Sequence, residues 1–279
     1  MLAMRGLATG LCAGCVVGLL RLSHDRAAAR VALWLEEWRE VWWTVPIWFG
    51  VLVALAVILR RIVREEPLIS GSGIPQTELA LAGRLSFTWW RVLLAKFLGS
   101  WLALFGGLAL GREGPSIQMG GAVGAGFHAL WRPAAPHALT GSPYVVAGAV
   151  AGLAAAFGAP AAGVLFAFEE MKSRRDTSLI VAACASAIGA HLMIRIVFGM
   201  GRILPFAGFE APPLSSFWIV ALEGAVFGVL GVGYNKTLLW LHDREAGQTL
   251  IPDRWRALPP LLLAGCLALF APLLIGGGE

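Results

Sequence analysis

Six long stretches of this sequence are dominated by apolar residues, and each is long enough to cross a lipid bilayer as a helix. A membrane-spanning helix needs about 20 predominantly apolar residues, because each residue advances the helix by about 1.5 Å. The pattern therefore predicts an all-α integral membrane protein. The predicted spans are residues 1–22, 45–63, 92–110, 177–198, 217–241 and 258–275.

Four further apolar stretches are shorter, or are interrupted by Gly and Pro. Broken helices at membrane depth are tolerated only where they line a cavity or are buried in protein, and they are a common feature of transport sites. The four stretches are residues 73–85, 115–131, 142–157 and 159–171. We therefore expect the chemistry of the protein to lie in or beside them.

The sequence also repeats itself. Gly10 and Gly14 recur as Gly224 and Gly228 in similar small-residue helices, and the pattern of residues 67–73 returns at 272–278. Two matches in the same order predict a second structural repeat in inverted orientation, as in many transporters. The predicted domains are a complete first repeat at 1–211 and the first two helices of a second repeat at 212–279. Such a chain is expected to be truncated.

Composition narrows the class of protein. Hydrophobic residues make up 58% of the chain and charged residues only 14%, whereas soluble domains carry about a quarter charged residues. The net charge of +5 is small, so nucleic acid is not an expected partner. Cys12 and Cys15 are spaced C-x-x-C, but no second pair or histidine follows them. Neither a metal nor a cofactor is predicted, and no nucleophile–base pair suggests an enzyme.

Basic residues follow three of the apolar stretches. Cytoplasmic loops of membrane proteins carry an excess of Lys and Arg. If these three loops are cytoplasmic, the N-terminus also lies in the cytoplasm. The residues are Arg60, Arg61 and Arg64 in the first loop, Lys172, Arg174 and Arg175 in the second, and Arg244, Arg254 and Arg256 in the third.

The first candidate anion-binding motif consists of Gly71, Ser72, Gly73, Ile74 and Pro75. Glycine lets the backbone approach a ligand closely, and proline suits the first turn of a helix. A helix N-terminus offers free N–H groups and a partial positive charge, to which Ser72 adds a hydroxyl donor. Partial charges suit a permeating halide, because a full positive charge binds it too tightly for release. The alternative is an ordinary Gly-Pro turn before a helix.

The second motif repeats this design and adds two charges. Ionised Glu113 is attracted to the amide groups that attract an anion, so it can occupy the anion's place and leave when protonated. Charge between two apolar runs is costly and usually functional. The alternative is a helix-capping Glu113 paired with Arg112. The motif consists of Gly111, Arg112, Glu113, Gly114, Pro115, Ser116 and Ile117.

The third motif combines a Gly/Ala-rich stretch, a Gly-Ala-Pro break and two carboxylates. Small residues permit close helix packing, and the break ends one helix and begins another. Glu169 and Glu170 follow the second of these helices. Neighbouring helical residues point about 100° apart, so we expect only one of them to enter a site. The alternative is a pair of interfacial carboxylates beside Lys172 and Arg174.

GSGIPQ at 71–76, GREGPSIQ at 111–118 and GLAAAFGAPAAGVLFAFEE at 152–170 together resemble the signature motifs of the CLC family of chloride channels and chloride/proton antiporters. The resemblance implies a CLC-type bundle of tilted and broken helices. It implies that Ser72 coordinates the central anion, with the amides around 73–74 and 116–117 facing the ion. By the same resemblance, Glu113 is the gating glutamate, Glu170 the internal proton-transfer glutamate, and Lys96 a buried lysine that biases the local field.

Carboxylates at both Glu113 and Glu170 favour chloride/proton exchange over a passive chloride channel. The family's second-repeat G-x-F-x-P helix start and its late tyrosine have no counterpart here, which leaves a third possibility of a non-conducting fragment that only assembles with other subunits. The resemblance implies a homodimer formed through residues 159–171 and 177–198. The expected partners are chloride, protons and the lipid bilayer, and the expected location is the bacterial inner membrane.

Overall fold

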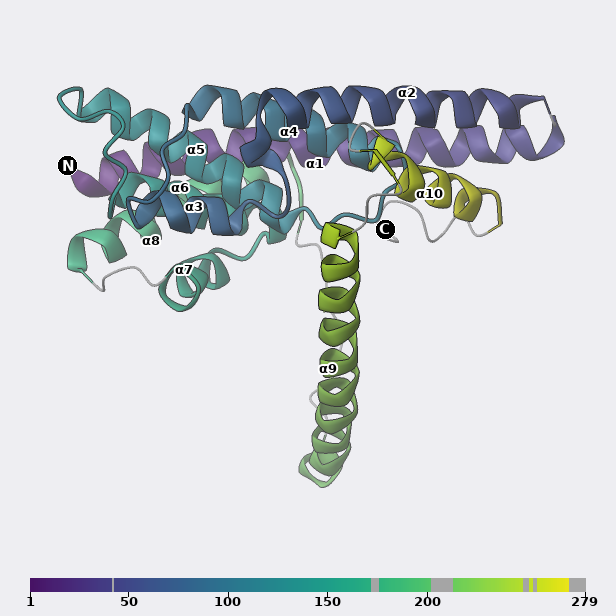
Figure 1. Cartoon of the computed structure of the whole chain (residues 1–279). Coiled ribbons are helices and arrows are strands. Elements are labelled where there is room, and N and C mark those ends of the chain that lie inside the picture. The colour runs from purple at the N-terminus through teal and green to yellow at the C-terminus, as the bar shows by residue number, and fades with distance from the viewer. Residues whose placement is uncertain (42, 172–175, 202–212, 248–250, 253–254, 271–279) are drawn as a thin grey trace. The chain divides into compact units, whose positions relative to one another are not determined.

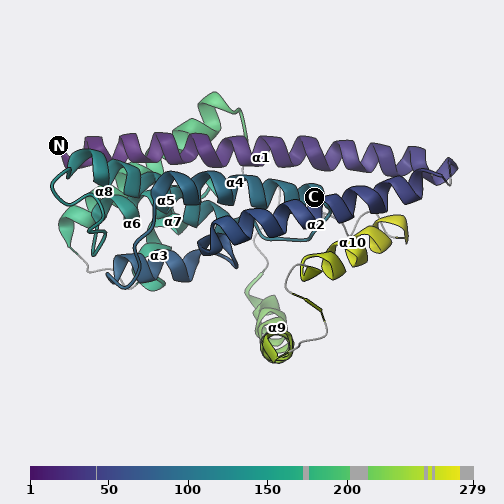
Figure 2. The same ribbon diagram turned by 45° about the horizontal axis from the view of Figure 1, so that its top comes forward.

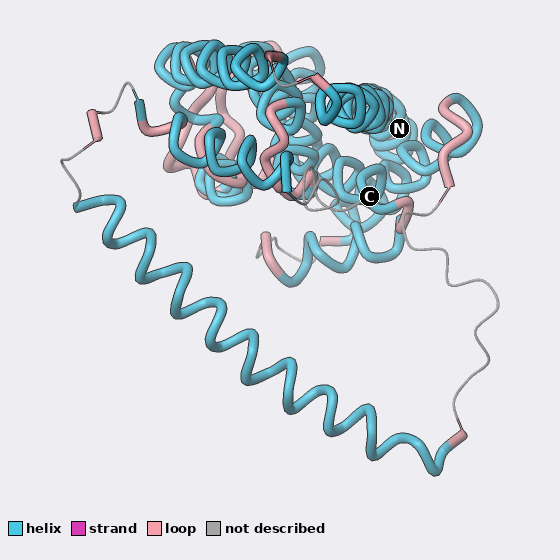
Figure 3. Tube along the Cα trace, turned by 90° about the vertical axis from the view of Figure 1, so that its right-hand side faces the viewer, coloured by secondary structure: helices cyan, strands magenta, loops and turns pink. Residues whose placement is uncertain are grey.

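The structure is a computed structural model that describes residues 1–41, 43–171, 176–201, 213–247, 251–252 and 255–270. Within these residues the chain forms helices joined by loops and contains no strand (Figure 3). Two compact units are distinguished: Met1–Ile203 together with Ala257–Glu279, and Leu204–Arg256. The all-α fold expected from the apolar pattern is confirmed.

The first unit contains nine of the α-helices (Figure 1). They are α1 (Leu2–Glu40), α2 (Thr44–Glu65), α3 (Ile74–Leu81), α4 (Trp89–Phe105), α5 (Glu113–Trp131), α6 (Pro143–Phe157), α7 (Pro160–Glu169), α8 (Thr177–Leu192) and α10 (Leu258–Phe270). A 3₁₀ turn, Pro67–Ile69, precedes α3, and a π-helical turn, Met193–Val197, extends α8. In the second unit, α9 (Phe217–Gly247) follows a 3₁₀ turn at Leu214–Ser216.

Each of the ten predicted apolar stretches contains a helix, but the prediction for the first was wrong at its end. The helix α1 continues through the polar residues after position 22 and reaches Glu40. No Gly or Pro occurs from residue 19 to residue 45, and the Ala, Leu, Arg and Glu residues there favour helix. The polar residues after position 22 therefore end the apolar stretch but not the helix.

Four helical segments in the described residues are long and apolar enough to cross a membrane. They are Leu2–Ala27, Thr44–Glu65, Thr177–Val197 and Leu214–Arg244. The remaining two predicted spans, 92–110 and 258–275, are shorter helices in the structure, because α4 has 17 residues and the described α10 has 13. Glycines at 106 and 107 end α4 before the predicted span is complete.

The centre of the first unit is α6, which is buried along nearly its whole length and packs against α1, α5 and α8 (Figures 1 and 2). Glycines set the distance between α5 and α6. A Cβ on Gly148 would collide with the carbonyl oxygen of Gly120, and one on Gly152 would collide with that of Ser116. The two helix backbones are therefore in direct contact, and α6 fixes the position of the first turns of α5.

The helices α1 and α8 pack just as closely and run in the same direction. Gly6 lies against the backbone of Ala182, and Gly10 lies against that of Ser186. Moving four residues along α1, from Gly6 to Gly10, also moves the contact four residues along α8, from Ala182 to Ser186. The two helices are therefore parallel, and both start at the same face of the unit. The small residues of α1 therefore allow its backbone to contact the backbone of α8, as close packing of small residues predicts.

The division at 211/212 into two repeats stays a prediction. That boundary lies outside the described residues, as does the 272–278 segment whose pattern echoes residues 67–73. The described part of α10 packs against α2 in the first unit, where Gly265 lies against Leu52 and Phe49.

Replacing Gly148 by alanine should destabilise the fold, because the new methyl group has no room beside Gly120. Overpacking of this kind costs about 1–3 kcal/mol. The control is Gly50→Ala on α2, where a Cβ meets no atom within 4 Å. Thermal unfolding in detergent should show a lower transition temperature for Gly148→Ala and an equal or higher one for Gly50→Ala, since alanine favours helix over glycine. Equal transition temperatures for the two variants would contradict the packing argument.

Candidate functional site

The first predicted motif forms a loop that leads into α3. Gly71 and Gly73 have φ angles of +72° and +91°, and Gly73 is the last residue before the helix. Such angles favour glycine because a Cβ would clash with the backbone. The N–H of Ile74 donates to Ser72 Oγ across 3.3 Å, and Ser72 itself is exposed. The Gly-Pro pattern therefore does begin a helix, with Ser72 at its N-terminus.

The four consecutive backbone carbonyls of residues 68 to 71 each accept a hydrogen bond from a side-chain nitrogen. Gln118 donates to Leu68 (2.7 Å), Lys96 to Ile69 (2.8 Å) and Gly71 (2.7 Å), and Gln76 to Ser70 (2.8 Å). These donors come from α5, α4 and α3. The loop before Ser72 is thus held from three helices, and its carbonyl oxygens are committed to donors within the protein.

Lys96 is the central donor of this arrangement. Its side chain is only 4% exposed, and its ammonium group bonds two backbone carbonyls. A buried charge is costly unless polar groups solvate it. The resemblance predicted Lys96 as a source of positive field, and the structure adds that Lys96 fixes the Ser72 loop.

The second motif forms the start of α5. Arg112 precedes the helix, Glu113 is its first residue, and Ser116 Oγ donates to the carbonyl of Arg112 across 2.6 Å. Glu113 is exposed and lies in the first helical turn, where the helix dipole favours a negative charge. This position is compatible with both the gating and the capping interpretations of Glu113.

The structure brings the first two motifs into contact. Gly114 is buried, and a Cβ on it would lie 2.6 Å from the carbonyl oxygen of Ser72 and 2.8 Å from its Cβ. The N-terminus of α3 and the N-terminus of α5 therefore meet, although about 40 residues separate them in the sequence. Two helix N-termini at one place add their partial positive charges.

Two charged residues of α1, Arg21 and Asp25, lie beside the second motif, and neither was predicted as a site residue. Asp25 Oδ1 lies 3.7 Å from Arg112 Nη1. Arg21, only 6% exposed, donates to the carbonyl of Ala155 near the end of α6 across 2.8 Å. Charges within a membrane helix are a signal of function, and Arg21 falls inside the first predicted span. That signal was available in the sequence, but the partners of these residues were not.

Glu169 and Glu170 lie at the end of α7, more than 50 residues after the second motif in the sequence. The helix α7 ends at Glu169, and both carboxylates are exposed. The break before α7 follows the prediction, since Gly158 ends α6 with a φ of +66° and Pro160 begins α7. The expectation that Glu170 rather than Glu169 enters a site stays a prediction.

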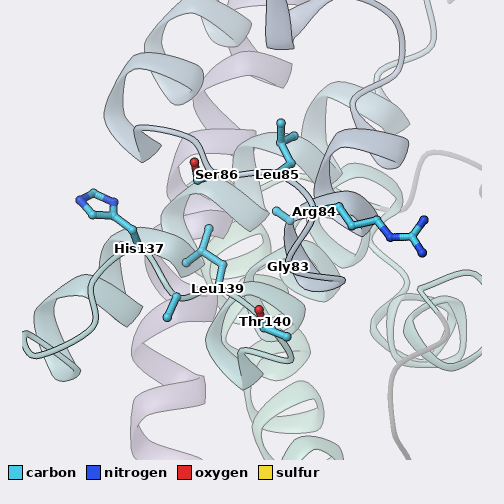
Figure 4. A pocket seen from close by; sticks show the side chains of 9 residues that line it. Gly83, Arg84, Leu85, Ser86, His137, Leu139 and Thr140 are labelled. Carbon is cyan, nitrogen blue, oxygen red and sulfur yellow. The ribbon is translucent and has the colours of Figure 1, made fainter.

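A pocket of about 330 Å³ lies at the opposite end of α3 from Ser72 (Figure 4). Residues 83–86 and 137–140 line it, and Gly141 N–H donates to the carbonyl of Leu81 beside it across 2.9 Å. The side chains of Arg84 and His137 point away from one another (Figure 4). This pocket therefore does not bring its two basic side chains onto one ligand.

Helices long and apolar enough to cross a membrane, together with short broken helices whose N-termini meet, define an all-α protein of the integral-membrane class. The family model described as voltage gated chloride channel matches residues 50–279. The chain belongs to this family, the CLC chloride channels and antiporters, as its motifs predicted.

Curated relatives and solved structures agree with this assignment. The chain is 36% identical over 279 residues to the H(+)/Cl(-) exchange transporter ClcA of Vibrio cholerae, covering 96% of this chain and 59% of the relative. It is 34% identical to the transporter of the same name from Cronobacter sakazakii. A slow cyanobacterial Cl-/H+ antiporter superposes with a TM-score of 0.88 at 28% identity, over 99% of this chain and 65% of the other. A CLC-type fluoride/proton antiporter shares the fold, with a TM-score of 0.69 at 19% identity.

Replacing Lys96 by methionine should loosen the Ser72 loop, because the carbonyls of Ile69 and Gly71 lose their donor. An unsatisfied buried polar group costs about 1–3 kcal/mol. Hydrogen exchange followed by mass spectrometry should show faster exchange at residues 70–76 in Lys96→Met. The matched control is Arg61→Met, which breaks an exposed ion pair with Glu65. Unchanged exchange at 70–76 in Lys96→Met would refute the role of Lys96 in holding the loop.

Proposed function

We propose that this chain takes part in anion transport across the membrane, with chloride/proton exchange as its activity. The observation that carries the proposal is the contact of Gly114 with Ser72, since it joins two helix N-termini at one place. The chain spans 59% of the length of the Vibrio cholerae transporter, so the activity of the whole relative is proposed for it rather than transferred.

The chemistry of this contact suits an anion. The resemblance assigns the donors to backbone amides around 73–74 and 116–117, at the first turns of α3 and α5. In the structure the Ile74 N–H donates to Ser72 Oγ and the Ser116 N–H donates to the Arg112 carbonyl across 3.1 Å, so an anion there competes with these bonds. Ser72 Oγ accepts a bond from the N–H of Ile74, so its own hydroxyl proton can be donated to an anion. The proposed anion-binding residues lie in two segments, 71–75 and 111–117. The four carbonyls before Ser72 are bonded elsewhere, which reduces repulsion of a negative ion.

Glu113 is the proposed gate. Its carboxylate is at the first turn of α5, where an ionised side chain competes with an anion for the same amides. Protonation removes the charge and ends the competition. One carboxylate can therefore couple the arrival of a proton to the entry of an anion.

Glu170 is the proposed internal proton-transfer residue. The support is its match to the second Glu of the family motif, together with relatives named as H(+)/Cl(-) exchange transporters and as a Cl-/H+ antiporter. The second candidate activity, a passive chloride channel, uses the same anion site without Glu170.

The proposed location is a bacterial inner membrane with the N-terminus in the cytoplasm. The supporting observation is that α1 and α8 start at one face, so the N-terminus and the start of α8 lie on the same side, and three basic residues, Lys172, Arg174 and Arg175, come shortly before α8 in the sequence. We also propose a homodimer through α7 and α8. Leu165 on α7 and Ile188 on α8 are exposed and apolar, as a lipid-embedded contact requires.

Glu113→Gln should abolish the coupling of proton to chloride movement, because the side chain can no longer change its charge. Chloride efflux from proteoliposomes containing the purified chain is followed by an electrode, and proton movement by a pH probe. Glu113→Asp keeps the charge and serves as the control, with coupling retained at a lower rate. Unchanged proton coupling in Glu113→Gln would rule out the gate assignment.

Glu170→Gln should reduce proton movement while chloride efflux continues. Glu169→Gln is the matched control, since the two carboxylates are neighbours and both are exposed. The same assay measures both variants.

Chloride efflux without any proton movement in the unaltered chain would instead support the passive channel. Absence of efflux, with the chain co-purifying with a longer relative, would support a role in assembly only.

A further inference from the structure

Three charged side chains, Arg21, Asp25 and Arg112, come together where α1 passes the start of α5. Arg112 and Glu113 belong to the second motif, and Asp25 lies 3.7 Å from the Arg112 guanidinium. Arg21 lies one helical turn before Asp25 and is bonded to the Ala155 carbonyl. The group therefore contains two positive charges and one negative charge.

The two members of the Asp25–Arg112 pair differ in their exposure. The Arg112 side chain is 14% exposed, whereas the Asp25 side chain is 50% exposed. Arg112 is thus largely buried in the protein beside the proposed anion site, and Asp25 supplies a negative charge to it from the protein surface. Arg26, the next residue along α1, is exposed and, within the described part of the chain, forms no ion pair with this group.

We propose that Asp25 is a positioning residue that neutralises Arg112 and thereby keeps an anion at the Glu113 loop weakly enough bound to be released. This inference rests on the proposed function, because it concerns the same anion site. Without Asp25, the group keeps its two positive charges and loses its negative one. The charge of Arg112 is then balanced less completely, so it attracts the permeating anion more strongly, and a tightly held anion leaves slowly.

A purely structural role for the pair predicts the opposite change in binding. If Asp25 only braces α1 against α5, its loss loosens the second motif and weakens anion binding. If Asp25 neutralises Arg112, its loss strengthens anion binding and lowers the maximal transport rate. The direction of the change in affinity therefore separates the two roles.

The test measures chloride binding to the full 279-residue chain in detergent by ³⁵Cl NMR line broadening, and chloride efflux from proteoliposomes in parallel. Asp25→Asn should tighten chloride binding by about twofold to fivefold, the range that partly exposed ion pairs give. Its maximal efflux rate should fall, and Asp25→Glu should restore both values. In the Arg112→Gln background, Asp25→Asn should leave binding unchanged.

Asp176→Asn is the matched control, since it is the same substitution at an exposed residue before α8. Gly6 of α1 packs on Ala182, so Asp176 lies near the start of α1, about 35 Å along the helix from Asp25. Unchanged or weaker binding in Asp25→Asn would overturn the inference, as would equal tightening in the Arg112→Gln background. Tighter binding without efflux from any variant would overturn the proposed transport and support the role of Asp25.

Discussion

The contact between Gly114 and Ser72 is the constraint on which the rest of the site depends. Because Gly114 has no side chain, the start of α5 can lie directly on the backbone of the loop that leads into α3. The position of α5 is in turn fixed by α6, against which Gly120 and Ser116 make backbone contact. The glycines of the core and the glycines of the motifs thus serve one purpose, which is to bring two helix N-termini together.

Holding a loop at that place requires its carbonyl groups to be satisfied. Lys96 and two glutamines supply the donors, and the buried ammonium of Lys96 is solvated by the same carbonyls that it fixes. Neither partner is stable in a membrane interior alone, since an unpaired charge and an unpaired carbonyl are each costly there. Their mutual satisfaction links the helix α4 to the geometry of the first motif.

The helices and the breaks between them were predictable because they follow from local properties, namely apolar length and the positions of Gly and Pro. The end of α1 was not, because Ser23 to Arg26 are polar yet compatible with helix. The contact of the two motifs and the bonds of Gln118 and Asp25 were also out of reach. Gln118 bonds a carbonyl 50 positions away, and Asp25 pairs with Arg112, the residue just before α5, so spacing along the sequence carries no signal for either pair.

Three cations lie near the proposed anion site, and each has a partner. Lys96 is bonded to two carbonyls, Arg21 to the Ala155 carbonyl, and Arg112 lies beside Asp25. A site with free cations would retain a chloride ion, whereas a site with none would repel it as it left water. Partnered cations leave the helix N-termini and the Ser72 hydroxyl as the main attraction. Because these carry only partial charges, the single carboxylate proposed as the gate, that of Glu113, would be able to compete with the anion.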